Sequence, residues 1–277
     1  MSSSSAAVDA ARRVAVAHAR AGQVDIRRLY VDETPDACEL LTEIWASGSG
    51  RPPIEASLLI ALLHADNYVA GAFAQQELVG VCVGFCTPPM QSGLHSHIAG
   101  VRPSNSGHGI GTALKLHQRA WALRRGLAAI SWTYDPLVAR NAYFNLGRLG
   151  AAAVDYIPDF YGEMTDGLNE GQRSDRMVVH WDLTRWPPTE PADNGEVRPV
   201  LEVGRAREPV FVELPAEAVA CRLAIPDDIA ALRSHDPELA DRWRHATGDA
   251  FTELLQQGWG VTGFDPAGFY LLTKAPG

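Results

Sequence analysis

Three alternating glycines form the part of the sequence that is best suited to bind a ligand. Gly107, Gly109 and Gly111 lie between a predicted strand that ends near Val101 and a predicted helix over residues 112–125. A strand-to-helix turn of this kind gathers unpaired backbone N–H groups at the positive end of a helix dipole, so it can bind phosphate without basic side chains. The alternative is a tight turn that holds no ligand, but three alternating glycines exceed what a turn requires. The spacing therefore favours an anion site.

The spacing excludes one phosphate-binding motif and partly matches another. A nucleotide P-loop requires a Gly-Lys pair, and the sequence contains none. A dinucleotide fingerprint that starts at Gly107 would need a third glycine where Thr112 stands. Asp135, at the end of the next predicted strand, stands where a ribose-binding acid would lie. A nicotinamide-dependent oxidoreductase therefore remains an alternative.

Histidines stand just before and inside the glycine turn. His97 lies on the predicted strand 94–101, and its reference pKa near 6.5 suits proton abstraction at neutral pH, so it is the candidate general base. His95 shares its face, and a His-x-His pair on a strand can also chelate a metal, whereas either histidine alone is equally well explained as a packed sheet residue. His108 in the turn either reaches a phosphate or is an exposed loop residue.

The hydrophobic periodicity places these residues on a series of helices and strands. Helices are expected over residues 6–21, 34–47, 53–64, 112–125, 137–149, 226–234 and 237–256. Strands are expected over residues 24–31, 68–74, 78–86, 94–101, 128–134, 175–183, 196–203 and 210–213. Residues 151–174 read as an irregular segment, and hairpin turns are expected at 75–77 and 265–268.

A Pro- and acid-rich segment over residues 186–196 is the predicted linker. The expected organisation is a helical extension over 1–23, a main domain over 24–185 and an accessory α+β region over 197–277. About 80 residues are marginal as a domain alone. We therefore expect the accessory region to pack on the main domain or on a second subunit.

The composition is that of an ordinary globular protein, with 46% hydrophobic and 21% charged residues. Lys and Arg total 24 against 33 Asp and Glu, and the net charge of −9 argues against a nucleic-acid or anionic-membrane surface. No apolar run approaches the roughly 20 residues of a transmembrane helix, and residues 1–7 lack the pattern of a secretory signal. We expect a cytoplasmic protein.

The cysteines predict neither disulfides nor a metal site. Four cysteines do not make a disulfide framework in a cytosolic chain of 277 residues. Cys82 and Cys86 lie on one predicted strand, where residues i and i+4 are about 13 Å apart. Zinc–sulfur bonds are about 2.3 Å, so these two thiolates cannot share an ion, and we expect no metal.

The turn resembles the pyrophosphate-binding motif of the GNAT acyltransferase superfamily, [RQ]-x-x-G-x-[GA]. Gly109 and Gly111 fall on its glycines, and Ser106 falls where Arg or Gln is usual. The order of elements over roughly residues 24–183 resembles the same family. The resemblance implies an α+β, three-layer fold, in which helices flank a mixed and mostly antiparallel central sheet, with a smaller α+β region at the C-terminus.

A narrower resemblance points to a little-characterised GNAT subgroup that carries an additional C-terminal region. It rests on short motifs at Ser96-His97, Asp135-Pro136-Leu137, Arg140-Asn141-Ala142, Phe144-Asn145-Leu146, Asp159-Phe160-Tyr161-Gly162 and Ser174-Asp175-Arg176.

The resemblance also implies a set of ligand-binding residues for acetyl-CoA. These are Gly100, Val101, Ser106, Gly107, His108, Gly109, Ile110, Gly111, Thr112, Asn141 and Asn145. Many family members use a Tyr as general acid three positions before a final Leu-Gly, and here Leu146 holds that position. Tyr143, one turn away, and Tyr134, at a strand end, are the alternative acids.

The expected function is therefore an acyl-CoA-dependent N-acyltransferase, most simply one that transfers acetyl from acetyl-CoA to an amine. The alternatives are the oxidoreductase and a non-catalytic acyl-CoA-binding or scaffold protein, the last because Ser106 and Leu146 depart from the family pattern. The acceptor, the acyl chain and the oligomeric state stay open, with a homodimer as one option.

Overall fold

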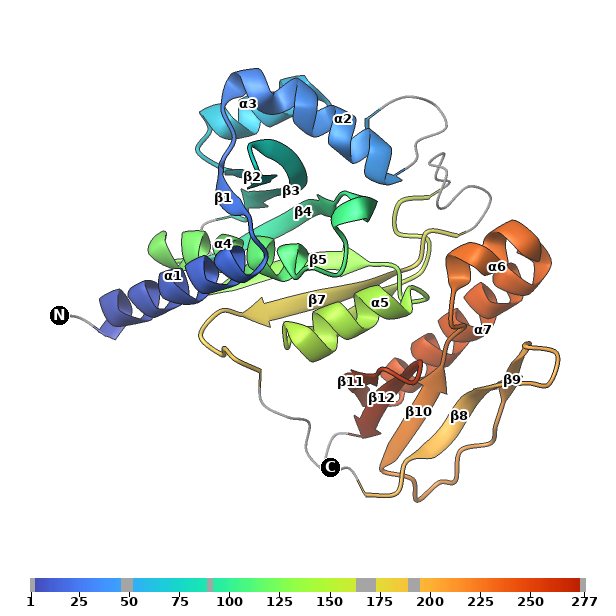
Figure 1. Cartoon of the computed structure of the whole chain (residues 1–277). Coiled ribbons are helices and arrows are strands. Elements are labelled where there is room, and N and C mark those ends of the chain that lie inside the picture. The colour runs from blue at the N-terminus through green and yellow to red at the C-terminus, as the bar shows by residue number, and fades with distance from the viewer. Residues whose placement is uncertain (1–2, 46–51, 89–91, 163–172, 189–194, 275–277) are drawn as a thin grey trace. The chain divides into compact units, whose positions relative to one another are not determined.

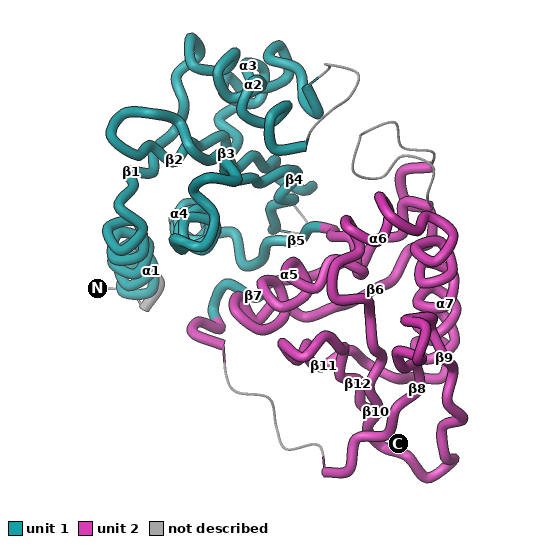
Figure 2. Tube along the Cα trace, turned by 45° about the vertical axis from the view of Figure 1, so that its right-hand side comes forward, with its two compact units in different colours: residues 1–132, 166–168, 182–184 teal, residues 133–165, 169–181, 185–277 magenta. Residues whose placement is uncertain are grey.

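A computed structural model describes residues 3–45, 52–88, 92–162, 173–188 and 195–274 of the chain. Among these residues the chain divides into two compact units (Figure 2). The first unit comprises residues up to Trp132 together with 182–184, and the second comprises 133–162, 173–181 and the described residues from 185 onward.

The first unit holds helices α1 to α4 and most of five strands (Figure 2). Its helices are α1 (Ser3–Ala21), α2 (Thr34–Trp45), α3 (Ala56–His64) and α4 (Ile110–Arg124), with short 3₁₀ helices over Val31–Glu33 and Pro103–Asn105. Its strands are β1 (Asp25–Arg28), β2 (Tyr68–Ala74), β3 (Glu77–Cys86), β4 (Gly93–Val101) and β5 (Ala129–Tyr134), the last of which crosses the boundary between the units.

Successive side chains of β2 and β3 point to opposite faces of the sheet, and each face packs against helices. Val69, Val81 and Val83 point to one face and pack in a single core with α2 and α3. On the other face the Tyr68 hydroxyl meets α4 at the His117 ring, and a Cβ on Gly80 would lie 3.1 Å from Leu114. Figure 1 shows α2 and α3 on one side of these strands and α4 on the other. This period of two is the pattern of a sheet buried on both faces.

The larger sheet has the strand order β1-β2-β3-β4-β5-β7-β6. The pairs β1–β2, β2–β3, β3–β4 and β6–β7 are antiparallel, and β4–β5 is parallel. The expected mixed and mostly antiparallel sheet with flanking helices is therefore confirmed.

The second unit contains a further sheet of five strands in the order β11-β12-β10-β8-β9. Its helices are α5 (Ala139–Ala142), which continues as a π-helix over Tyr143–Arg148, α6 (Ile229–His235) and α7 (Pro237–Gln256). Its strands are β6 (Ala152–Ile157), β7 (Arg176–Asp182, whose last residue belongs to the first unit), β8 (Arg198–Val203), β9 (Pro209–Phe211), β10 (Ala220–Ala224), β11 (Trp259–Asp265) and β12 (Phe269–Lys274).

Each predicted helix corresponds to an observed one, but the prediction missed two strands. Residues 151–174 were expected to be irregular, yet β6 pairs there with β7. The register of β6 shifts between Ala153 and Asp155, so its side chains lack the alternation that marks a strand. The sequence Ala220–Ala224 carries little β propensity, but β10 lies at the centre of the second sheet. The predicted helix end at residues 46–47 lies outside the described residues.

A buried ion pair ties the C-terminal helices to the residues that follow β5. Arg244 of α7 donates to both carboxylate oxygens of Asp135 at 2.8 Å, and Arg233 of α6 donates to one of them at 2.8 Å. The side chains of Arg244 and Asp135 are 1% and 9% exposed. Residues 229–256 thus pack within the same compact unit as residues 133–162. The domain boundary at 185/186 stays a prediction.

Loss of this pair should destabilise the second unit. Arg244→Met leaves the Asp135 carboxylate with Arg233 alone, and we expect the free energy of unfolding to fall by roughly 3 kcal/mol, as for other broken buried pairs. Urea denaturation followed by circular dichroism measures it. Arg207→Met removes the exposed pair with Asp227 and is the matched control, with an expected loss of at most about 1 kcal/mol.

The pH dependence follows from the same contacts. Burial acts to raise the pKa of Asp135, but Arg244 and Arg233 outweigh it and hold the pKa well below its usual range. The stabilisation is therefore complete above the unfolded pKa of about 3.9 and is lost only as the pH falls toward the depressed folded value. A stability difference between wild type and Arg244→Met that vanished already at neutral pH would contradict this account.

Candidate functional site: the glycine turn and the end of β4

The turn between β4 and α4 requires glycine at two positions. Gly107 has φ +84° and Gly109, the N-cap of α4, has φ +78°. This left-handed region is accessible to glycine at little cost. A Cβ at either position would have no heavy atom within 4 Å, so backbone conformation and not crowding explains the glycines. Gly111 lies in the first turn of α4.

The turn leaves a run of backbone N–H groups without partners. Within the described part of the chain, no acceptor bonds the N–H groups of residues 107–112. The ladder resumes at Ala113, whose N–H donates to the Gly109 carbonyl at 3.0 Å. The amides before the run are satisfied, since Asn105 and Ser106 donate to carbonyls of the preceding 3₁₀ turn. Six consecutive amides at a helix N-terminus can bind an anion.

Side-chain cations contribute little to this turn. The Arg102 guanidinium is paired with the carboxylates of Glu43 and Glu77. The His108 ring lies 3.3 Å from the Asn105 carbonyl, within the turn itself. Ser106 is exposed and offers only its hydroxyl in place of a longer side chain. Anion binding here would therefore rest on the backbone.

The strand that leads into the turn separates from its neighbour. The parallel ladder between β4 and β5 ends at the pair His95–Ser131, although β4 continues to Val101. The stretch of β4 over residues 96–101, which includes the candidate Gly100, thus has an edge that β5 does not pair. A Cβ on Gly100 would lie 2.7 Å from the Trp45 ring, so glycine is required there for packing. An unpaired edge can bind an extended chain that carries amides.

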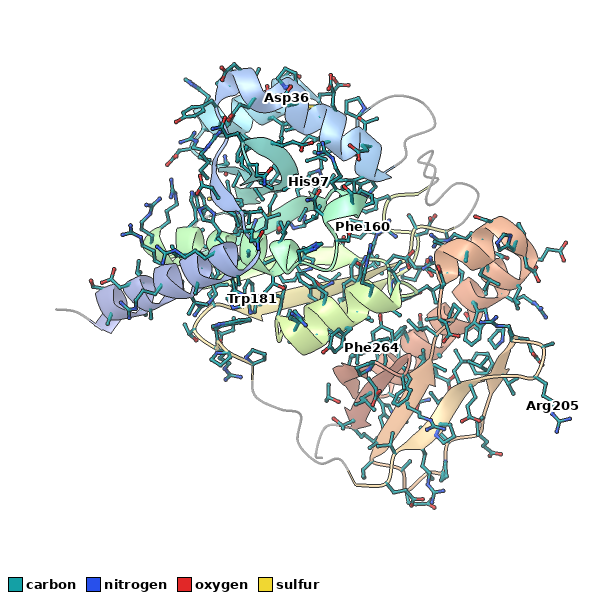
Figure 3. The ribbon with its side chains drawn as sticks, in the orientation of Figure 1. Asp36, His97, Phe160, Trp181, Arg205 and Phe264 are labelled. Carbon is teal, nitrogen blue, oxygen red and sulfur yellow. The ribbon has the colours of Figure 1, made fainter. Side chains whose placement is uncertain are left out.

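A β-bulge lies on the same stretch of β4. Gly84 pairs with Ser96 and Val83 pairs with Ile98, which leaves His97 as the extra residue. Bulges redirect side chains and often stand near active sites. The ring of His97, labelled in Figure 3, lies 6.0 Å from the Phe85 ring and 6.3 Å from that of His95.

The surroundings of the two histidines favour their neutral form. Burial lowers the pKa of His97, and burial, His97 and Lys115 lower the pKa of His95. A neutral imidazole at pH 7 is the form that accepts a proton. The described residues include no group of three or more His, Cys, Asp or Glu placed to hold a metal ion.

The remaining predicted site residues belong to the second unit, so their roles stay predictions. Tyr134 is buried, which raises its pKa, and its hydroxyl oxygen lies 3.3 Å from that of Tyr270. Tyr143 is 40% exposed, on the π-helix. Asn145 and Leu146 of that helix are buried. Asn141 of α5 is half-buried.

Asp135 does not have the free carboxylate that a ribose-binding acid needs. Both of its oxygens accept from Arg244, and one also accepts from Arg233. A side chain with both oxygens held by arginines has no room for a second bidentate partner. The nicotinamide alternative therefore loses the residue that accompanied its incomplete fingerprint.

Lys115 on α4 is a candidate functional residue that is not among those predicted from the sequence. Its side chain is 4% exposed, and its Nζ donates to the Ser96 hydroxyl at 2.8 Å. The chain has two lysines among 24 basic residues, and this one falls among apolar positions of a predicted amphipathic helix. A rare lysine among apolar positions of a helix is the feature of the sequence that could have indicated a buried cation.

Comparisons with known proteins find similarity in structure alone. No family model and no curated protein matches the chain. The ribosomal-protein-S18-alanine N-acetyltransferase of Escherichia coli is 13% identical with a TM-score of 0.47, and the match covers 58% of this chain and 95% of that one. The paia N-acetyltransferase of Thermoplasma acidophilum, solved in complex with coenzyme A, is 13% identical with a TM-score of 0.40, covering 57% and 98%.

An aminoglycoside 6′-acetyltransferase of type Ii is 19% identical with a TM-score of 0.48, and the match covers 59% of this chain and 99% of that one. The chain is thus similar in structure to N-acetyltransferases over somewhat more than half of its length. No helix within the described ranges has the length and apolar character needed to cross a membrane.

The histidine environments can be tested by NMR titration. We expect His97 and His95 to titrate below the ordinary value of about 6.5 because burial disfavours the imidazolium. His117, where burial and Arg124 lower the pKa to about 4, should titrate at a lower pH. Histidine-selective ¹³C labelling gives the curves, and His97→Gln assigns the resonance. A His97 pKa above 6.5 would contradict the structure.

Proposed function

We propose that the protein is an acyl-CoA-dependent N-acyltransferase that transfers an acetyl group from acetyl-CoA to an amine. The observation that carries this proposal is the run of six unpaired amides over residues 107–112, which follows directly from the unpaired edge of β4. The unpaired amides can bind the pyrophosphate of coenzyme A. The unpaired edge of β4 can form hydrogen bonds with the extended arm of coenzyme A, which carries amides. A protein of net charge −9 binds such an anion by this local device and not by its overall field.

The chain's own residues supply the binding and the base. The turn amides hold the pyrophosphate, and the edge over residues 96–101 orients the arm, while Asn141 and Asn145 are proposed as further polar contacts. Neutral His97 takes the proton of the attacking amine. The amine nitrogen bonds to the thioester carbonyl carbon, the C–S bond breaks, and coenzyme A leaves with the electron pair on sulfur. Of the two candidate acids, the exposed Tyr143 is favoured over the buried Tyr134.

A second candidate function is a non-catalytic acyl-CoA-binding protein. It is favoured by Ser106 and Leu146, two positions at which the chain lacks the side chain usual in the family that it resembles. A thiol-release assay with acetyl-CoA over an amine library separates the two, since binding without release supports the second. A cytoplasmic location and a homodimer stay predictions from the sequence.

The turn can be tested by a bulky substitution at Gly109. Gly109→Val forces an L side chain into a left-handed conformation at the head of the amide run, so CoA affinity measured by calorimetry should fall at least tenfold, or roughly 1.4 kcal/mol. Gly126→Val is the matched control, because Gly126 has φ +77°, open surroundings and a place at the other end of α4. Equal affinity of a folded Gly109→Val protein and the control would remove the pyrophosphate from this turn.

The base can be tested once an acceptor from the library is in hand. His97→Ala should lower kcat by about 10²–10⁴-fold with CoA affinity little changed. His95→Ala is the control on the same strand and should retain most of the activity. An equal loss in both variants, together with metal-dependent turnover, would indicate a chelating pair. Full activity of His97→Ala would exclude His97 as the base.

A further inference from the structure

A buried lysine lies where β4 and β5 separate. Lys115 Nζ lies 3.8 Å from the centroid of the Trp132 ring, in addition to its hydrogen bond to Ser96. Ser96 and Trp132 are the residues that follow the last pair of the β4–β5 ladder, His95–Ser131. The ammonium therefore contacts the first residue of each strand that lies beyond the parallel pairing.

This ammonium has no acidic partner. No Asp or Glu forms an ion pair with it among the residues that the structure describes, and its other contact is the Gln118 Oε1 at 3.4 Å. Cys82 of β3 also lies beside it and is not an anion, because burial raises the pKa of the Cys82 thiol. The cluster holds a buried cation without a counter-charge.

A second donor in the cluster is also unsatisfied. The Nε2 group of Gln118 has no hydrogen-bond partner, although the residue is 0% exposed. Buried donors and buried cations are costly unless an acceptor or an anion meets them. The Gln118 Nε2 lies toward Gly84 of β3, so it is the uncompensated ammonium of Lys115 that points to a negatively charged group received from a ligand.

The length of β4 indicates which part of the ligand arrives there. From Val101, beside the glycine turn, back to Ser96 the strand spans about 17 Å at roughly 3.4 Å per residue. The arm of coenzyme A between pyrophosphate and thiol has the backbone length of between four and five peptide residues, about 15 Å when extended. An arm that starts at the turn and follows the edge of β4 thus ends with its sulfur near Ser96 and Lys115.

We propose that Lys115 is the cation that stabilises the thiolate of coenzyme A as it leaves. The proposal rests on the proposed function and deepens it, because it assigns the role of the general acid, which Leu146 cannot fill, to Lys115 in place of Tyr143. When the C–S bond breaks, the electron pair stays on sulfur, the amine proton goes to His97, and the thiolate pairs with the ammonium. A proton of Lys115 can then pass to sulfur, and solvent returns it.

The acidity of Lys115 fits this role. Burial lowers its pKa to about 8. An alkyl thiol has a pKa near 8.5, so the two groups are matched for proton exchange, and the lysine is still mainly cationic at pH 7. An arginine would remain charged under all such conditions and could not give up its proton.

The test measures the thiol of bound coenzyme A and needs no acceptor. The ultraviolet band of the thiolate is followed against pH for wild type saturated with coenzyme A, with the desulfo analogue as the blank for protein groups. We expect the thiol pKa to fall by at least about one unit from its solution value near 8.5, equal to tenfold. Lys115→Met, which keeps the length without the charge, should return it to the solution value or above.

Lys274→Met is the matched control, since it removes the other lysine of the chain, on β12 in the second unit. It should leave the thiol pKa depressed. An unshifted thiol in wild type that binds coenzyme A would overturn the role of Lys115 and leave the proposed function intact. Failure of wild type to bind coenzyme A in calorimetry would overturn both. The wild-type titration decides the question even where Lys115→Met does not fold.

Discussion

The left-handed conformation of Gly107 and Gly109 is the constraint on which the first unit's candidate site depends. It determines the residue at which α4 begins, and therefore which amides are left without acceptors. It also determines the phase of α4, and with it which side chains of that helix meet the sheet. The free turn amides and the orientation of Lys115 both follow from this backbone conformation. Lys115 lies less than two helical turns after Gly109, the N-cap of α4.

One buried charge in each unit differs in whether the protein neutralises it. Asp135 accepts hydrogen bonds at both oxygens from two guanidiniums, so its charge is neutralised within the protein. Lys115 has a hydroxyl, an amide oxygen and an aromatic face, and none of these neutralises it. A buried charge that is neutralised by the protein serves the fold, whereas a buried charge without a counter-charge can interact with a ligand. This contrast distinguishes a structural charge from a candidate functional one.

Much of the first unit could be predicted from the sequence, because its signals are local. The glycine spacing, the periodicity of residues 112–125 and the hairpin of β2 and β3 each lie within a short window. The partners of Asp135 could not be predicted, since they come from 98 and 109 residues away. The bulge at His97 depends on the register of a neighbouring strand. The environment of Lys115 depends on the residues of β4 that α4 packs against. No pattern within a short window encodes these contacts.

The long reach of the Asp135 pair also has a consequence for the order of folding. The first unit is continuous up to Trp132 apart from the return at residues 182–184, so nearly all of it emerges from the ribosome before α6 and α7 are made. The second unit begins at residue 133 but receives its arginines from positions 233 and 244. The strands β6 and β7 can pair with each other early, but the Asp135 carboxylate has no arginine partner until the last part of the chain is synthesised. We therefore expect the first unit to fold during translation. The second unit can complete its core only when synthesis of the chain is nearly finished.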